Sequence, residues 1–143
     1  MEGWFGWIES TSVARAIAQS LTLTASLSAT HLLGFTLVMG AALVVNFSLL
    51  GWVRAAGAAP DVLRSCNRAI VIGLAISVTT GALLFAARAS DVSANGTFQL
   101  KMLLLLAAAG FHFAVARSRV GAAGSLTLWI ALAVTACAFI LLE

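Results

Sequence analysis

The feature that most constrains this chain is a run from residue 21 to 53 that carries no charged side chain. It reads LTLTASLSATHLLGFTLVMGAALVVNFSLLGWV and contains no Asp, Glu, Lys or Arg. As an α-helix rising about 1.5 Å per residue it would be ~50 Å long, more than the ~30 Å hydrocarbon core of a bilayer. An unpaired strand in lipid would leave its backbone groups without hydrogen bonds. The run therefore predicts a membrane-spanning helix.

The composition of the whole chain is that of a membrane protein. Of its 143 residues, 62% are hydrophobic and 9% are charged, whereas soluble domains carry roughly 25% charged residues. The net charge is +3, and the basic residues fall mainly in the segments that connect the apolar runs. We therefore expect the lipid bilayer to be its main partner. We interpret the basic residues as topology signals, not as a nucleic-acid-binding surface.

The sequence predicts an all-α fold in a single membrane domain that covers residues 1–143. Four spans are expected, at about residues 21–53, 69–87, 100–116 and 125–142. They are joined by polar segments at residues 54–68, 88–98 and 117–124. These spans predict a four-transmembrane-helix bundle.

An amphipathic helix at the membrane interface is expected to precede the bundle, over residues 3–20. Ser10 is a candidate N-cap within this region, and Val13 and Ile17 follow at helical spacing. Trp4 and Trp7 are typical of the aromatic belt where the membrane meets water.

The distribution of basic residues predicts the topology. The first and third connecting loops hold five arginines, namely Arg54, Arg64, Arg68, Arg117 and Arg119. The other side holds three basic residues, namely Arg15, Arg88 and Lys101. The positive-inside rule then places both termini outside the cytoplasm.

Two histidines, His31 and His112, lie within predicted spans. An ionisable side chain at membrane depth is costly and marks a candidate functional site. The first and third spans run in the same direction, so the two histidines lie on parallel helices. Histidines on facing helices are typical axial ligands of a b-type haem, each offering a neutral nitrogen to iron. We predict His31 and His112 as haem-iron ligands.

Small residues near these histidines are the candidates for making room for the porphyrin. Gly34 lies three residues after His31, and Gly73, Ser77 and Gly81 recur every four residues in the second span. Such a face lets another helix or a flat cofactor approach closely. We therefore include these four residues in the predicted cofactor-binding set.

Arg88 and Lys101 could meet the haem propionates. Counted from the outer side, His112 lies eleven residues beyond Lys101, and His31 lies at a matching depth if the bilayer begins near Ser20. Counted from the cytoplasmic side, His112 is five residues from Arg117, whereas His31 is twenty-three from Arg54. That difference is about 27 Å along a helix.

Other interpretations of the polar residues stay open. Met39 or Met102 could serve as a sulfur ligand, or each histidine could hydrogen-bond within the bundle without a cofactor. Asn46 is expected to make a hydrogen bond between helices. No paired intramembrane carboxylate and no nucleophile–base pair is evident, so no catalytic residue is predicted, and neither a proton-driven pump nor a hydrolase is indicated.

The runs WIESTSVARAIAQSL, HLLGFTLVMGAALVVNFSLLG and FQLKMLLLLAAAGFHF resemble an uncharacterised family of small four-helix bacterial inner-membrane proteins. The pair His31 and Gly34 more loosely resembles copper-resistance membrane proteins of the CopD type and small b-type cytochromes. The family tends to have an acidic residue at the position of Asn46, and an Asn at the position of His112. The resemblance implies a bacterial inner-membrane location and marks His31 as the family feature.

The sequence thus supports two main functional hypotheses. The first is a b-haem electron-transfer subunit with bis-histidine ligation that acts with a dehydrogenase or a quinone. The second is a cofactor-free accessory or assembly subunit of a larger membrane complex. A metal- or quinone-handling protein of the CopD type, with His31 as a single ligand, is a third. In each case we expect a homo-oligomer or a subunit of a complex, and more a redox carrier or accessory protein than a self-contained enzyme.

Overall fold

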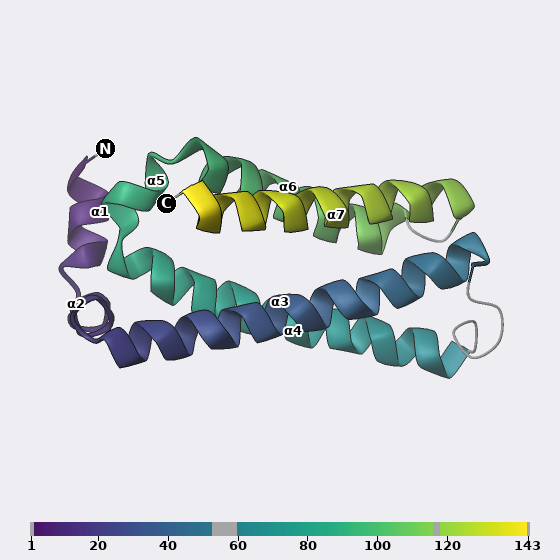
Figure 1. Cartoon of the computed structure of the whole chain (residues 1–143), viewed down its shortest axis with the longest axis horizontal. Coiled ribbons are helices and arrows are strands. Elements are labelled where there is room, and N and C mark those ends of the chain that lie inside the picture. The colour runs from purple at the N-terminus through teal and green to yellow at the C-terminus, as the bar shows by residue number, and fades with distance from the viewer. Residues whose placement is uncertain (1, 53–59, 116–117, 143) are drawn as a thin grey trace. The chain divides into compact units, whose positions relative to one another are not determined.

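The computed structural model describes residues 2–52, 60–115 and 118–142, and all its regular elements are helices (Figure 1). In chain order they are α1 (Glu2–Glu9), α2 (Ser12–Gln19), α3 (Leu21–Leu50), α4 (Pro60–Ala87), α5 (Ala89–Ser93), α6 (Gly96–Val115) and α7 (Arg119–Leu142). Four of them, α3, α4, α6 and α7, are long and apolar enough to cross a membrane. The predicted all-α fold class with four long apolar helices is confirmed, and the pattern is that of a multi-pass membrane protein.

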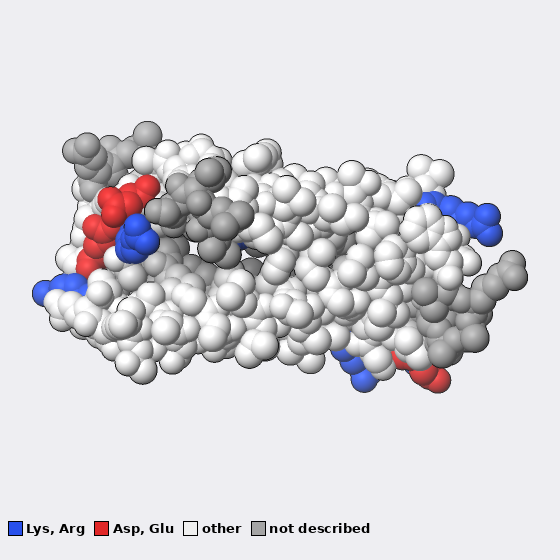
Figure 2. Space-filling view, viewed as in Figure 1, with Lys and Arg blue, Asp and Glu red and all other residues white. Residues whose placement is uncertain are grey.

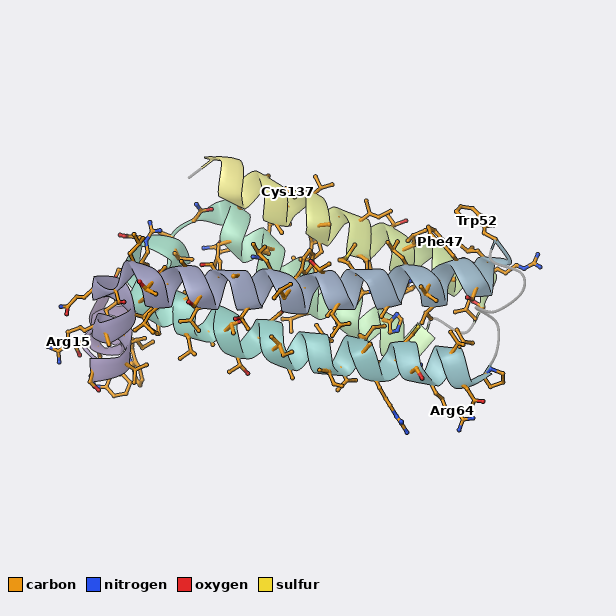
Figure 3. The ribbon with its side chains drawn as sticks, turned by 60° about the horizontal axis from the view of Figure 1, so that its bottom comes forward. Arg15, Phe47, Trp52, Arg64 and Cys137 are labelled. Atoms are coloured by element: carbon orange, nitrogen blue, oxygen red, sulfur yellow. The ribbon has the colours of Figure 1, made fainter. Side chains whose placement is uncertain are left out.

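The end of α3 is set by Gly51. This glycine has φ +80°, a left-handed conformation in which a side chain would be strained. Its amide donates to the carbonyl of Ser48 (3.1 Å), and the amide of Trp52 donates to that of Phe47 (3.0 Å). This pair of bonds is the Schellman motif. The Phe47 and Trp52 rings also meet, with centroids 5.4 Å apart (Figure 3). The helix therefore ends at Leu50, and the predicted end at about residue 53 lies outside the described residues.

The other long helices begin before the spans that the sequence predicted. The helix that contains the second span begins at Pro60, nine residues before residue 69, because proline suits the first helical position and Asp61 places a carboxylate in the first turn. Asp61 also pairs with Arg64 at 2.6 Å. Likewise α6 begins at Gly96 and α7 at Arg119. The polar ends of these helices extend beyond their apolar centres.

The N-terminal region forms two helices where one was expected. Thr11, not Ser10, caps α2, since its hydroxyl accepts from the amide of Ala14 (3.3 Å). The Ser10 hydroxyl donates instead to the carbonyl of Trp7 (2.7 Å). The Thr24 hydroxyl, in the first turns of α3, donates to the carbonyl of Ile17 (2.8 Å) and ties α2 to the helix that follows it.

The segment expected to be a polar turn, residues 88–98, contains the short helix α5 (Ala89–Ser93). The first turn of α5 is capped by another element, because the Glu9 carboxylate of α1 accepts from the amide of Ser90 (2.7 Å). Ala89 and Val92 of α5 are buried. A helix of five residues is unstable alone, so these tertiary contacts account for it.

The chain divides into two compact units. The first comprises residues 1–38 and 71–95, and the second comprises residues 39–70 and 96–143, so α3 and α4 contribute to both. Buried apolar side chains of the first unit include Ile17, Val38 and Val92. Those of the second include Val45, Ile70, Ala108, Trp129 and Leu132. That the chain works as a single membrane domain stays a prediction.

Candidate functional site

His31 lies in the first unit, on α3, and is bonded to α4. Its Nδ1 is 2.9 Å from the carbonyl oxygen of Ser77 and 3.3 Å from the Thr80 hydroxyl. A carbonyl oxygen can only accept, so Nδ1 carries a hydrogen, and in the neutral imidazole Nε2 then carries the lone pair. The Ser77 hydroxyl donates in return to the carbonyl of His31 (3.2 Å). The two helices are thus joined by bonds in both directions.

Glycines allow this contact between α3 and α4. A Cβ at Gly73 would lie 2.7 Å from the carbonyl oxygen of Gly34, and a Cβ at Gly34 would lie 2.7 Å from the Ser77 hydroxyl. A Cβ at Gly81 would lie 3.0 Å from Cε1 of His31. The structure places helix α3 against this small-residue face.

The first unit therefore brings together five of the six predicted site residues, His31, Gly34, Gly73, Ser77 and Gly81. The sequence missed Thr80, whose hydroxyl donates to the carbonyl of Ile76 (2.7 Å) and also lies near the imidazole. Its position three residues after Ser77 was the available signal, because residues three and four apart share a helix face.

His112 lies in the second unit, where both of its ring nitrogens have side-chain partners. Nε2 is 3.3 Å from Oδ1 of Asn67 on α4, and Nδ1 is 3.4 Å from the Ser125 hydroxyl on α7. With the amide of Asn67 in this orientation, Nε2 donates to it and Nδ1 accepts from the Ser125 hydroxyl. A neutral His112 thus joins α4, α6 and α7.

The surroundings of His112 are buried and partly aromatic. The His112 side chain is 6% exposed, and its ring meets the Trp129 indole edge-on, with centroids 6.3 Å apart. Ser125 and Trp129 are fully buried. The sequence pointed to none of Asn67, Ser125 and Trp129. The spacing of Ser125 and Trp129, four residues apart on one helix, was the only signal, and Asn67 was assigned to a loop.

Asn46 corrects another expectation. Its amide nitrogen donates to the carbonyl of Ala42 (2.8 Å), one turn earlier on the same helix, so this bond does not join two helices. Asn46 is fully buried, and its Oδ1 has no hydrogen-bond partner among the described residues. A short polar side chain can bond its own helix backbone, which is also how Thr30, Thr36 and Ser48 bond.

The two predicted haem ligands belong to different compact units. Each histidine is bonded within its own unit, through the partners given above. Within residues 2–52, 60–115 and 118–142, no three side chains of His, Cys, Asp or Glu gather as a metal site would require. Ligation of one haem by both histidines stays a prediction.

Figure 2 shows how charged side chains are distributed over one face of the molecule. On the face shown in Figure 2, charged side chains lie mainly toward the ends of the long helices and the middle stretches are uncharged. Arg64, near the start of α4, points away from the helices (Figure 3) and is paired with Asp61. The polar groups with specific partners inside the spans are therefore mainly neutral ones.

Comparison of the chain with protein-family models, with curated proteins and with solved structures finds no match. The resemblance to small bacterial four-helix membrane proteins rests on the short motifs around His31 and the start of the third span, and it stays a prediction.

Proposed function

We propose that this chain is an accessory or assembly subunit of a larger membrane complex. One observation carries the proposal: the polar groups and small residues that marked a candidate cofactor site are used to hold its own helices together. His31 and Ser77 join α3 to α4, and His112 joins α4, α6 and α7. A role in packing needs no further reactant at either histidine.

The outward faces of the helices support the same proposal. Large apolar side chains are exposed on every long helix; on α6 they include Leu103 and Leu106, which are 65% and 70% exposed. In the most apolar stretch of α6, 11% of the residues are buried, compared with 39% in the most apolar stretch of α7. Because α6 is covered least by the chain itself, it offers the most surface to lipid or to the helices of another subunit.

The orientation belongs to this proposal. We place the chain in a bacterial inner membrane with both termini outside the cytoplasm, as the five arginines of the first and third connecting segments indicate. Partner subunits would then contact it chiefly inside the bilayer, since its connecting segments are short.

Site-specific photocrosslinking in native membranes tests this function. A photoreactive residue at Leu106 is expected to form adducts with a defined neighbouring protein or with a second copy of the chain. The matched control is Ala108 on the same helix, which is fully buried and should form no intermolecular adduct. Adducts with lipid alone at Leu103 and Leu106 would contradict the proposal.

A second candidate function is electron transfer through a b-type haem. His31 favours it, because its Nδ1–H donates to a backbone carbonyl and so fixes the tautomer in which Nε2 carries the lone pair. This arrangement is common for histidines that bind iron. A bound haem would supply one-electron transfer with a dehydrogenase or a quinone. His31 would be a ligand, and His112 could be one only after losing a contact with Asn67 or Ser125.

A reduced-minus-oxidised visible spectrum of the purified protein, expressed with ample haem, separates the two functions. The accessory-subunit proposal predicts a featureless spectrum. A sharp α-band that is lost in both His31→Ala and His112→Ala would establish bis-histidine ligation. A band lost only in His31→Ala would assign one ligand to His31 and the other to another residue. Either band would overturn the cofactor-free proposal.

A further inference from the structure

The N-terminal helix α1 has two different faces, and one of them is fixed to the rest of the first unit. The Phe5 ring meets the Phe85 ring of α4 edge-on, with centroids 6.2 Å apart. Four residues later, the Glu9 carboxylate accepts from the amide of Ser90 and caps α5 (2.7 Å). Phe5 and Glu9 lie on one side of α1 because residues four apart share a helix face.

The other face of α1 presents two tryptophans. Trp4 is 75% exposed and Trp7 is 66% exposed, and their spacing of three places both on one side of the helix. Fully burying an aromatic side chain removes roughly 150–250 Å² from water. Two neighbouring indoles on a fixed helix are thus an apolar surface with polar N–H edges, and nothing in the described part of the chain covers them.

The place of α1 in the chain indicates what covers them. Its partner α5 is separated from the end of α4 by the single residue Arg88, and α2, which follows α1, is separated from the start of α3 by the single residue Ser20. The start of one membrane-spanning helix and the end of another therefore lie beside the α1 region. Indole rings favour the boundary between headgroups and hydrocarbon, which is where the ends of spanning helices lie.

We infer that Trp4 and Trp7 dock α1 into the headgroup–hydrocarbon boundary of the bilayer, and that the Glu9 cap on α5 holds them at that depth. The helix carries two glutamates and no Lys or Arg. Its docking therefore does not depend on anionic lipid, unlike that of basic interfacial helices. The partner is the lipid boundary itself and not a particular headgroup.

Fluorescence quenching of the full chain in phosphatidylcholine vesicles tests the docking. The emission of Trp4 and Trp7 is obtained as the difference between the natural chain and a variant with Trp4→Phe and Trp7→Phe. We expect lipids brominated near the carbonyl end of the acyl chain to quench this emission more than lipids brominated near the methyl end. Replacing half of the lipid with an anionic one should leave the quenching unchanged.

Trp129→Phe is the matched control, because the Trp129 side chain is fully buried and its emission should not respond to brominated lipid. Quenching of Trp4 and Trp7 by aqueous iodide but not by brominated lipid would overturn the inference, and so would insensitivity to both quenchers. Quenching by brominated lipid that requires anionic lipid would contradict the inference that the docking of α1 does not depend on the charge of the lipid.

The role of Glu9 has its own test. Glu9→Gln keeps an oxygen that can accept from Ser90, whereas Glu9→Ala removes it. We expect Glu9→Ala to speed amide hydrogen exchange in α5 and to broaden the depth profile of the two tryptophans. Glu9→Gln should keep both close to those of the natural chain. Equal behaviour of the two variants would contradict a positioning role for the side-chain oxygen of Glu9 that accepts from Ser90.

Discussion

His31 and His112 lie on apolar helices and are held in different ways. His31 is bonded to a backbone carbonyl of α4, and its ring lies against Gly81, so its environment is built from the close approach of two helix backbones. His112 is bonded to the side chains of Asn67 and Ser125. Their tautomers also differ, with hydrogen on Nδ1 in His31 and on Nε2 in His112. The comparison shows that one residue type can depend on glycine spacing in one unit and on polar side chains in the other.

If backbone approach defines the His31 region, the largest effect is expected from Gly73→Leu. Its Cβ would lie 2.7 Å from the Gly34 carbonyl oxygen, which cannot move without moving α3. We expect a loss of unfolding free energy of more than about 3 kcal/mol, at the upper end of overpacking effects. Unfolding by sodium dodecyl sulfate in mixed micelles, followed by circular dichroism, measures it.

Gly40→Leu is the control. Gly40 also lies on a long apolar helix, α3, but nothing lies within 4 Å of a Cβ at this position. Equal destabilisation by Gly73→Leu and Gly40→Leu would show that close backbone approach is not what limits substitution at Gly73.

If side-chain partners define the His112 region, His112→Ala should be the next most damaging change. It leaves Asn67 and Ser125 without their imidazole partner and opens a cavity beside Trp129. We expect a loss of about 2–3 kcal/mol in the same unfolding assay. Asn67→Ala and Ser125→Ala should each cost about 1 kcal/mol. In the His112→Ala background each should cost less, and strict additivity would contradict the three-residue cluster.

His31→Ala is expected to cost less, about 1 kcal/mol, in the range measured for hydrogen bonds between membrane helices. The reason is that its partners keep other bonds: the Thr80 hydroxyl still donates to the Ile76 carbonyl. Gly81→Ala would place a Cβ 3.0 Å from Cε1 of His31 and so displace the imidazole. This substitution should reproduce part of the loss of unfolding free energy. A larger loss for His31→Ala than for His112→Ala would reverse the comparison.

The smallest effect is expected from Trp129→Phe. The indole N–H is buried and has no hydrogen-bond partner among the described residues, so removing it sacrifices no bond. The change in unfolding free energy should stay within about 0.5 kcal/mol, because deleting an unsatisfied buried donor can offset the lost ring area. A loss well above this, with the helical content unchanged, would show that Trp129 packing on His112 matters more than its N–H.

The sequence by itself determined the all-α class and the four apolar helices, because hydrophobicity and the need to satisfy backbone groups in lipid are local properties of each segment. It also indicated His31 with its glycine neighbours, since the spacing of Gly73, Ser77 and Gly81 follows from helix geometry. It did not predict the cap of α5 by Glu9.

Only the tertiary structure decided which groups the histidines contact. His31 meets Ser77 across 46 residues of chain, and His112 meets Asn67 across 45. Such pairs depend on how helices cross, which residue spacing within one helix does not encode. The same holds for Ser90, whose partner Glu9 is 81 residues away. Local chemistry fixed where the four long helices form, and packing between helices fixed what their few polar groups do.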